Sequence, residues 1–347
     1  MKLQNFINKN LYKRSIISII LYPISILYAF LQISFRKLYR KKILRSFKSR
    51  IKIISIGNIV SGGSGKTPFT IFLAKYLTEN GKKVAISHRG YKGDYENLVT
   101  LISDFQEVFP YAKHAGDESF LIALKSPRIP VISGRNRKLA IKILEKKFPD
   151  LDYIILDDSY QHHRVQRDYD FVIFNHIGGI GNRMVLPSGI LREPLSTLKH
   201  SDFIVYRGSK TIPNYLKKYN KPILTGSYKI SRIYNRTFER FEVSDLSNKR
   251  IALLSGIGLP ESFENTIKKA NLDFVHHFKM PDHYDFKDIS LFYQIKSELS
   301  IRKIDAILTT EKDFSKLQFL PIIGLPFYIV AIEFSLDNED FVSELLE

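Results

Sequence analysis

Cysteine is missing from the 347-residue chain, which excludes disulfides, cysteine nucleophiles and thiolate metal sites. Acidic residues are missing from the first fifty positions, where twelve Lys and Arg residues stand in a chain of net charge +18. The basic excess therefore belongs mainly to the N-terminal segment. With 44% hydrophobic and 25% charged residues the chain is not of a disordered class, and at roughly 150 residues per domain its length predicts about two domains.

Charged residues are also missing from Ser15 to Ser34, where the sequence reads SIISIILYPISILYAFLQIS. A helix of about 20 residues is about 30 Å long, which matches the hydrocarbon thickness of a bilayer. We interpret residues 1–50 as a membrane anchor whose basic flank, Arg36–Arg50, binds anionic membrane lipid. Because Pro23 and several serines interrupt the apolar stretch, an amphipathic helix in the headgroup layer stays open as an alternative, as does a buried soluble helix.

Most of the N-terminal cations follow the apolar stretch, so the positive-inside rule places its C-terminal side in the cytoplasm. We therefore expect the chain at the inner (cytoplasmic) membrane, with its body on the cytoplasmic side. The basic run adjoins an apolar segment and not a folded recognition module, so nucleic acid is not expected as a partner.

Short apolar, β-branched runs alternate with helical patterns through the rest of the chain. This alternation predicts a doubly wound, mostly parallel α/β sheet over residues 51–220 and a second, smaller α/β domain over 221–347, with the polar stretch Ser209–Lys221 at the boundary. The predicted strands include Ile51–Gly57, Val84–Ser87, Tyr153–Leu156, Phe171–Phe174, Ile251–Ser255 and Ala306–Thr309, and the predicted helices include Lys66–Glu79, Arg137–Lys147 and Lys287–Leu299.

A glycine-rich loop connects the first predicted strand to the first predicted helix of the body. Its glycines let backbone N–H groups point at phosphate oxygens, and the helix N-terminus adds a favourable dipole. Lys66 would reach the β- and γ-phosphates of ATP, and Thr67 would hold Mg²⁺. The strict P-loop pattern has Gly where this chain has Val60, but the strand–loop–helix context is kept. The predicted nucleotide cradle comprises Val60, Ser61, Gly62, Gly63, Ser64, Gly65, Lys66 and Thr67.

An apolar strand that ends in two acids, Ile154–Asp158, has the pattern of a Walker B site. A carboxylate at the C-terminal end of such a strand meets the Mg²⁺ that accompanies the phosphates. We predict a metal role for Asp157 or Asp158, and the spacing leaves open which of the two contacts the ion. Taken alone, such acids are more often turn or helix-cap residues.

Seven blocks in a fixed order extend the pattern over most of the chain. With them the chain resembles the tetraacyldisaccharide 4′-kinases of lipid A biosynthesis, which implies two α/β domains with the active site in a cleft. The resemblance implies transfer of the ATP γ-phosphate to the 4′-hydroxyl of a tetraacylated glucosamine disaccharide 1-phosphate, the lipid A precursor. The blocks are GNIVSGGSGKTPF (57–69), SHRGYKG (87–93), AGDESFL (115–121), ILDDSYQHHRVQRDYD (155–170), LPSGILREPL (186–195), MPDHYDF (280–286) and LTTEKD (308–313).

The resemblance also implies roles for individual residues. It places the catalytic carboxylate at Asp117, paired with His283, and a histidine beside a carboxylate can orient it or take up the hydroxyl proton. Glu118 is a further candidate for the metal shell. Positions proposed to contact nucleotide, sugar or substrate phosphate are Gln161, His162, Arg192, Glu193, Arg135 and Arg137, for several of which a solvated surface role is as reasonable.

Three positions depart from the family pattern: His88 stands where serine is common, Ser159 follows the acidic pair where a small residue is usual, and His163 replaces an arginine. An alternative reading is a P-loop ATPase or GTPase switch of the partitioning or metal-chaperone type. Those proteins carry a signature lysine where this chain has Ser61, and no clear guanine-recognition motif is present. We expect no obligate protein partner.

Overall fold

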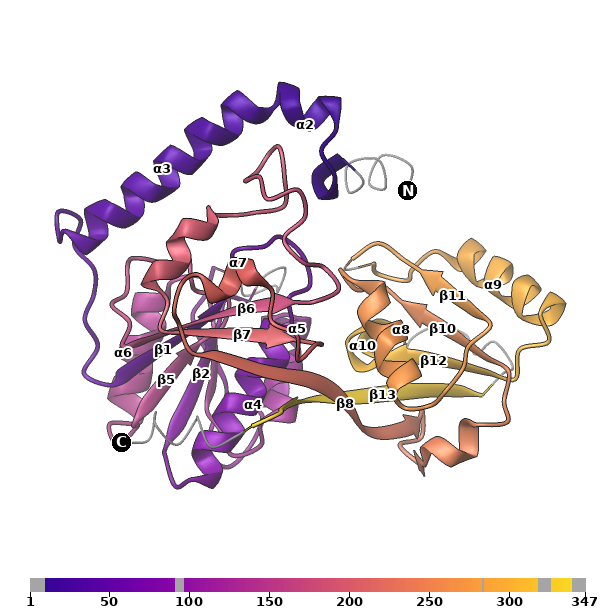
Figure 1. The fold of residues 1–347 in the computed structure, drawn as a ribbon. Coiled ribbons are helices and arrows are strands. Elements are labelled where there is room, and N and C mark those ends of the chain that lie inside the picture. Colours follow the sequence, from indigo (N-terminus) through magenta and orange to yellow (C-terminus); the bar gives the residue numbers. More distant parts are fainter. Residues whose placement is uncertain (1–9, 91–96, 283, 318–325, 339–347) are drawn as a thin grey trace. The chain divides into compact units, whose positions relative to one another are not determined.

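The computed structural model describes residues 10–90, 97–282, 284–317 and 326–338, and these residues fall into two compact units. Unit 1 comprises Met1–Ser227 and Leu336–Glu347, and unit 2 comprises Tyr228–Ser335. The chain passes from unit 1 into unit 2 along strand β8 and returns along β13 (Figure 1). The sequence-based boundary after residue 220 falls just before β8, whereas the units divide within that strand.

Unit 1 is built on a mixed sheet with the strand order β8-β7-β6-β1-β5-β2-β4-β3. The pairs from β7–β8 through β6, β1, β5 and β2 to β4 are parallel, and β3 joins β4 in the antiparallel sense. The α/β sheet predicted from the sequence is thus confirmed. The strands are β1 Lys52–Gly57, β2 Val84–His88, β3 Thr100–Ser103, β4 Val131–Ser133, β5 Tyr153–Leu156, β6 Tyr169–Asn175, β7 Phe203–Arg207 and β8 Ile223–Asn235.

Helices pack on the sheet of unit 1 through apolar faces, which arise because apolar residues recur at helical spacing in the sequence. In α6, Ala140, Ile141 and Leu144 are fully buried against strand residues, while Asn136 caps the helix by accepting a hydrogen bond from the Leu139 backbone N–H. These helices are α4 Lys66–Glu79, α5 Asp117–Lys125, α6 Arg137–Lys147 and α7 Asn214–Lys217, and the same unit contains the 3-10 turns Pro110–Ala115 and Leu195–His200.

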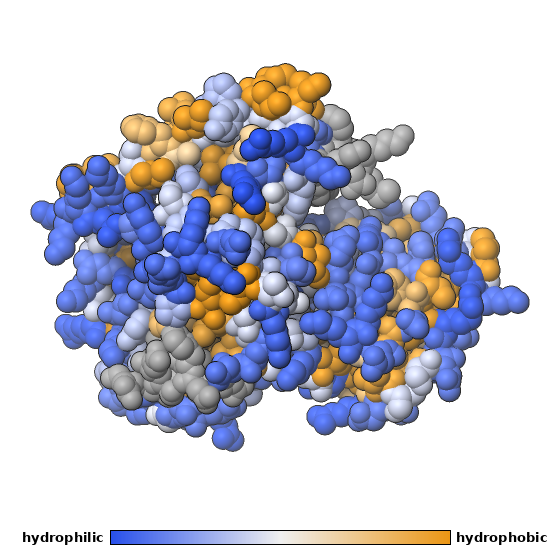
Figure 2. All heavy atoms as spheres, in the orientation of Figure 1, coloured by the Kyte–Doolittle hydropathy of each residue, from blue (hydrophilic) through white to orange (hydrophobic). Residues whose placement is uncertain are grey.

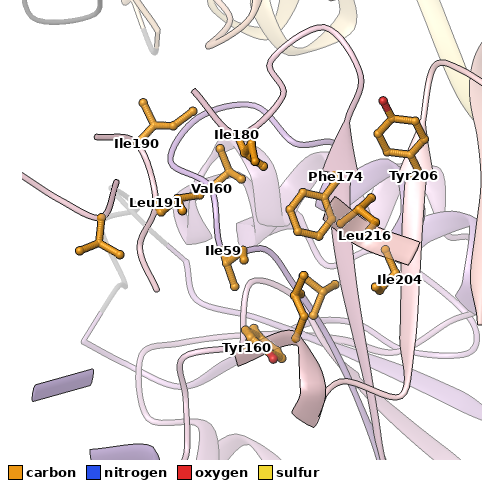
Figure 3. Close-up of a cluster of buried hydrophobic side chains, with 13 residues drawn as sticks. Ile59, Val60, Tyr160, Phe174, Ile180, Ile190, Leu191, Ile204, Tyr206 and Leu216 are labelled. Atoms are coloured by element: carbon orange, nitrogen blue, oxygen red, sulfur yellow. The ribbon is translucent and has the colours of Figure 1, made fainter. Parts of the chain in front are cut away.

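A cluster of buried apolar side chains lies next to the loop that follows β1 (Figure 3). Ile59 and Val60 of that loop pack with Ile190 and Leu191, and the cluster continues to Phe174 of β6. Each buried side chain of this size contributes about 1.5–3 kcal/mol relative to exposure. The apolar side chains of the loop after β1 therefore anchor the loop in the core, and its polar backbone can face a ligand.

The N-terminal apolar stretch forms two helices, α2 Ile16–Ile20 and α3 Tyr22–Arg40. Ser15 caps α2, and the chain breaks at Leu21 so that Pro23 lies in the first turn of α3, where its missing N–H costs no helix hydrogen bond. The interruption expected at Pro23 is present as this break between the two helices. Within the described residues we find no helix whose length and hydropathy suffice to cross a membrane.

One face of α3 packs on the rest of unit 1, and the opposite face is apolar and exposed. Tyr28 and Ala29 contact the cluster of Figure 3. Figure 2 shows apolar side chains gathered along α2 and α3. The exposed apolar residues of these two helices are Ile16, Ile17, Ile19, Ile20, Tyr22, Ile24, Ile26, Leu27, Phe30, Leu31, Ile33 and Phe35.

Unit 2 is a second α/β layer with the strand order β11-β10-β12-β13-β8. Strands β10, β11, β12 and β13 pair in parallel, and β9 joins β8 in the antiparallel sense. The fully buried Leu253 and Leu308 lie at the centre of its core on one face of the sheet. The elements are β9 Arg240–Phe241, β10 Ile251–Ser255, β11 His276–Lys279, β12 Ala306–Thr310, β13 Phe327–Leu336, α8 Pro260–Lys269, α9 Ile289–Ile301, α10 Glu311–Leu317 and the 3-10 turn Val243–Leu246.

Candidate active site

The strand order of unit 1 reverses at β1. From β1 the chain winds outward through β2 and β4, returns to β5 on one flank of β1, and then continues through β6 on the other flank. In parallel α/β sheets the loops at the C-terminal ends of the strands form a crevice at such a reversal, and ligands bind there. The glycine-rich loop follows β1 and the acidic pair follows β5, so the fold brings both predicted motifs to this position.

The loop after β1 has the backbone of a phosphate cradle. Gly62 and Gly65 adopt φ angles of 106° and 89°, which favour glycine, and Gly65 is the N-cap of α4. The Asn58 side chain donates to the Val60 carbonyl at 2.6 Å and to the Ser64 hydroxyl at 2.7 Å, which fixes the loop from inside. The N-terminus of α4 therefore faces the site with backbone N–H groups suited to an anion.

Thr67 joins the cradle to the acid-ended strand. Its hydroxyl donates to Asp157 Oδ2 at 3.0 Å, and Thr70, one turn further along α4, donates to Asp157 Oδ1 at 3.0 Å. The Asp157 side chain is almost completely buried. Thr70 was not among the sequence-based candidates, although its place three residues after Thr67 on the same helix face was visible in the sequence.

Asp158 lies beside two cationic side chains in the same site. Its Oδ1 lies 3.6 Å from Lys66 Nζ and accepts a hydrogen bond from Arg192 Nη1 at 3.2 Å. Burial raises the pKa of Asp158, but the charges of Lys66 and Arg192 outweigh burial and hold that pKa below its ordinary value. The two acids of the pair thus occupy different surroundings: Asp157 contacts the hydroxyls of α4, and Asp158 contacts the cations.

The first turn of α5 brings further acids to the site. Asp117 and Glu118 are the first two residues of α5, and Gly116 is the N-cap of that helix. Glu118 Oε2 lies 3.5 Å from His88 Nε2, which itself lies 3.7 Å from Asp157 Oδ2. Asp117 is exposed at the start of the helix, directly beside Glu118.

The remaining candidates of unit 1 take different positions. Gln161 donates to the Asn58 carbonyl at 2.8 Å and so supports the cradle. His162 is largely buried, and this burial together with nearby arginines lowers its pKa to about 4, so its ring is neutral at pH 7. Arg135 is exposed at the surface. Glu193 is buried and pairs with Arg36 of α3 at 2.7 Å.

Arg137 lies beneath the site and not at its surface. Its guanidinium donates to the Ser87 hydroxyl at 3.0 Å and to the Asp157 carbonyl, and its side chain is almost fully buried. Burial lowers the pKa of Arg137 to about 10, against the opposing charges of Asp157 and Asp158. Arg137 therefore fixes the backbone of the acidic turn, a position different from the substrate-phosphate contact considered from the sequence.

Unit 2 carries the last two sequence blocks. Predicted partner His283 lies outside the described residues. Its neighbour Asp282 pairs with Lys312 of α10 at 3.5 Å, and Thr310 donates to Asp313 at 2.7 Å. The MPDHYDF and LTTEKD blocks are thus linked at the C-terminal ends of the strands of unit 2.

The site combines a glycine-rich cradle at a helix N-terminus with a lysine beside it. A buried carboxylate is hydrogen-bonded to the threonine that follows this lysine. Together these features define a P-loop nucleotide-binding protein of the phosphoryl-transfer class. The family model for tetraacyldisaccharide-1-P 4′-kinase matches residues 17–347. The chain belongs to this family.

Individual relatives agree with the family match. The chain is 32% identical over 312 residues to a tetraacyldisaccharide 4′-kinase of Pelobacter propionicus, covering 89% of this chain and 85% of the relative. It is 33% identical over 319 residues to the corresponding protein of Chlamydia abortus, with the same coverage of each chain. A crystal structure of LpxK from Aquifex aeolicus in complex with ATP superposes with a TM-score of 0.74 at 26% identity, covering 95% of this chain and 98% of that one. These matches do not favour the switch-ATPase alternative.

Proposed function

We propose that this chain transfers the γ-phosphate of ATP to the 4′-hydroxyl of a tetraacylated glucosamine disaccharide 1-phosphate. Family membership supports the substrate, and the LpxK structure in complex with ATP supports the phosphate donor. The observation in this structure that carries the proposal is the hydrogen bond from Thr67 to Asp157, because it joins the phosphate cradle to a buried carboxylate. Phosphoryl transfer needs that combination of cradle and carboxylate.

The donor set fits Mg²⁺. A hydroxyl and a carboxylate oxygen stand 3.0 Å apart at Thr67 and Asp157, with Glu118 close by, and Mg²⁺ prefers oxygen ligands completed by nucleotide phosphates and water. Among the residues described, no group of three or more His, Asp and Glu side chains forms a metal cage by itself. When bound with ATP, Mg²⁺ would neutralise charge on the transferring phosphate.

Each remaining side chain has a role that follows from its position. Lys66, at the start of α4, contacts the phosphate chain, and its present partner Asp158 keeps the ammonium group at the site. Arg192, paired with the same carboxylate, is placed to hold a phosphate oxygen with its planar guanidinium. We propose Asp117 as acceptor of the hydroxyl proton, supported by its exposed place beside Glu118, with His283 as the expected partner.

The test of this function is transfer of radiolabelled γ-phosphate from ATP to a lipid A disaccharide precursor, with simple phospholipids as control acceptors. We expect Lys66→Ala to abolish transfer and Asp117→Asn to remove most turnover while ATP still binds. Lys83→Ala, at an exposed surface pair with Asp150, is the matched control and should keep full activity. A purified wild-type protein that hydrolyses ATP but labels no precursor would refute the kinase assignment.

We also propose that the open faces of α2 and α3 hold the protein on the inner membrane, with the body on the cytoplasmic side. The exposed apolar residues of these helices stand beside exposed cations, including Lys37, Arg40, Lys41, Lys42 and Arg45. Apolar residues that enter the headgroup boundary gain about 1 kcal/mol each when half their surface is buried there, and each nearby cation adds about 1 kcal/mol on anionic lipid. A precursor with acyl chains in the bilayer would thereby meet the site without leaving the membrane.

Flotation with vesicles that contain phosphatidylglycerol tests the membrane proposal. The double substitution Ile26→Glu and Phe30→Glu, at side chains 53% and 64% exposed, should release the protein from the vesicles. Ile301→Glu at the end of α9, 73% exposed, introduces a similar charge away from these helices and should leave binding unchanged. Equal binding of the double variant and the wild type would refute the proposal.

A further inference from the structure

His88 is the last residue of strand β2, and it is almost completely buried. The Gly90 backbone N–H donates to His88 Nδ1 at 3.0 Å, and the Ser119 hydroxyl lies 2.8 Å from the same nitrogen. A backbone N–H can only donate, so Nδ1 carries the lone pair and the proton of the neutral ring is on Nε2. The hydrogen-bond network thus fixes which nitrogen of His88 faces the site with a proton.

The protonated nitrogen faces two carboxylates from different elements. Nε2 lies 3.5 Å from Glu118 Oε2 at the start of α5 and 3.7 Å from Asp157 Oδ2 after β5. These distances exceed those of strong hydrogen bonds, but an N–H dipole between two anions reduces their mutual repulsion. Asp157 Oδ2 is also the oxygen that accepts from Thr67, so this contact reaches the centre of the candidate metal site.

We propose that His88 is a positioning residue for the divalent cation that accompanies ATP: its Nε2–H holds the carboxylates of Asp157 and Glu118 together for the ion, without binding the ion itself. To act as a ligand, His88 would need a lone pair on Nε2 and a proton on Nδ1. A proton on Nδ1 would point at the Gly90 N–H, which is also a donor. The geometry therefore favours a His88 that contacts the metal-binding carboxylates over a His88 that binds the ion. The inference rests on the proposed function, since it concerns the ion that ATP brings.

The surroundings of the ring hold it in one orientation. Ser119 Oγ lies 3.0 Å from Ser133 Oγ, which donates to the Ala115 carbonyl at 3.2 Å, and both serines are buried. Gly90 adopts a φ of 71°, and a Cβ at this position would collide with Ser133 Oγ. Glycine is therefore what allows the Gly90 N–H to reach His88. A ring held this tightly keeps its Nε2–H on the carboxylates.

The experiment measures the affinity of the full-length protein for the ATP analogue AMPPNP, with and without Mn²⁺, so that the ratio of the two affinities reports the coupling to the ion. His88→Asn places an amide near the Nδ1 position but has no atom at Nε2. His88→Gln is longer and places its terminal N–H near Nε2. We expect His88→Asn to reduce the coupling ratio at least tenfold, within the 10–100-fold range seen for residues that support metal ligands, and His88→Gln to reduce it less than threefold.

A purely structural histidine would lower both affinities together and leave the ratio unchanged in both variants, which would overturn the proposal. Electron spin-echo spectroscopy of bound Mn²⁺ supplies a second readout. A directly bound imidazole nitrogen that is detected in the wild type and lost in His88→Gln would make His88 a ligand and also overturn the proposal. Should His88→Asn fail to fold, Ser119→Ala decides, since loss of the hydroxyl at Nδ1 should reduce the ratio by about two- to threefold, and an unchanged ratio refutes the idea. Transfer of phosphate to the lipid precursor by the wild type is scored separately, so failure of this inference leaves the proposed function standing.

Discussion

Replacing Arg36 with methionine tests the buried ion pair that joins α3 to the rest of unit 1. The Arg36 and Glu193 side chains are 4% and 1% exposed, and both Arg36 Nε and Nη2 donate to Glu193 Oε2, at 3.2 and 2.7 Å. The guanidinium also lies 4.4 Å from the centre of the Tyr160 ring. Methionine keeps most of the apolar stem but leaves the Glu193 carboxylate buried without its counter-charge.

Breaking a buried pair from one side costs about 3–5 kcal/mol, because the remaining charge has lost both water and partner. The chain has two compact units and need not unfold in one step, so the fitting measurement is amide hydrogen exchange in the peptides around residues 190–200. At about 1.4 kcal/mol for each factor of ten, we expect Arg36→Met to speed exchange there roughly 100- to 5,000-fold.

Two further variants separate charge from packing. The double substitution Arg36→Met and Glu193→Leu removes both charges and should restore most of the protection. Arg40→Met, on the same helix but at an exposed contact with His200, should change exchange less than threefold. Exchange in Arg36→Met within threefold of the wild type would show that the pair does not hold α3 in place.

Three other outcomes follow from single positions. Gly57→Ala should destabilise unit 1 by about 1–3 kcal/mol in a denaturant titration, because the new Cβ would lie 2.5 Å from Tyr160 Cβ; a neutral effect would contradict that close approach. Thr67→Val should lower phosphate transfer at least tenfold because it removes the hydroxyl bonded to Asp157, whereas Thr67→Ser should keep most activity; equal loss in both variants would count against the hydroxyl. Burial, with Arg36 and Arg167 nearby, lowers the pKa of His163 to about 3, so the unfolded chain takes up the proton first and stability should fall as pH drops from 6.5 towards 3. His163→Gln should reduce the dependence of stability on pH by up to about 1.4 kcal/mol per pH unit, measured from denaturation midpoints across that range. An unchanged dependence would show that the folded protein does not keep His163 neutral.

Local sequence patterns predicted the elements with strong apolar periodicity. Helices α4 and α6 and strand β5 have the bounds expected for Lys66–Glu79, Arg137–Lys147 and Tyr153–Leu156. Strand β8, Ile223–Asn235, was not predicted, because polar residues are scattered through its sequence ILTGSYKISRIYN and only four of its thirteen residues are buried. Pairing with neighbouring strands, and not local propensity, makes it a strand.

The site was predictable where motif residues lie next to one another, and less so where the contact joins distant positions. The phosphate cradle and the acidic pair could be read from the sequence because each belongs to one strand and one loop. Two contacts join elements that are far apart in the chain: Arg36 with Glu193, and His88 with Asp157. No regular spacing in the sequence predicts such contacts. Arg36 in particular follows an apolar stretch, where a cation is expected to face lipid headgroups and not a buried carboxylate.

The route of the chain between its two units has a practical consequence. Unit 2 starts within β8 and finishes within β13, and these two strands are hydrogen-bonded neighbours. Asp337, just past the end of β13, bonds back to Thr225 of unit 1 at 2.9 Å. A stop codon after β8 would therefore remove part of the first unit as well. Excision of residues 228–335 with a short glycine bridge across the gap would instead yield a minimal nucleotide-binding protein, on which ATP affinity could be measured apart from any acceptor.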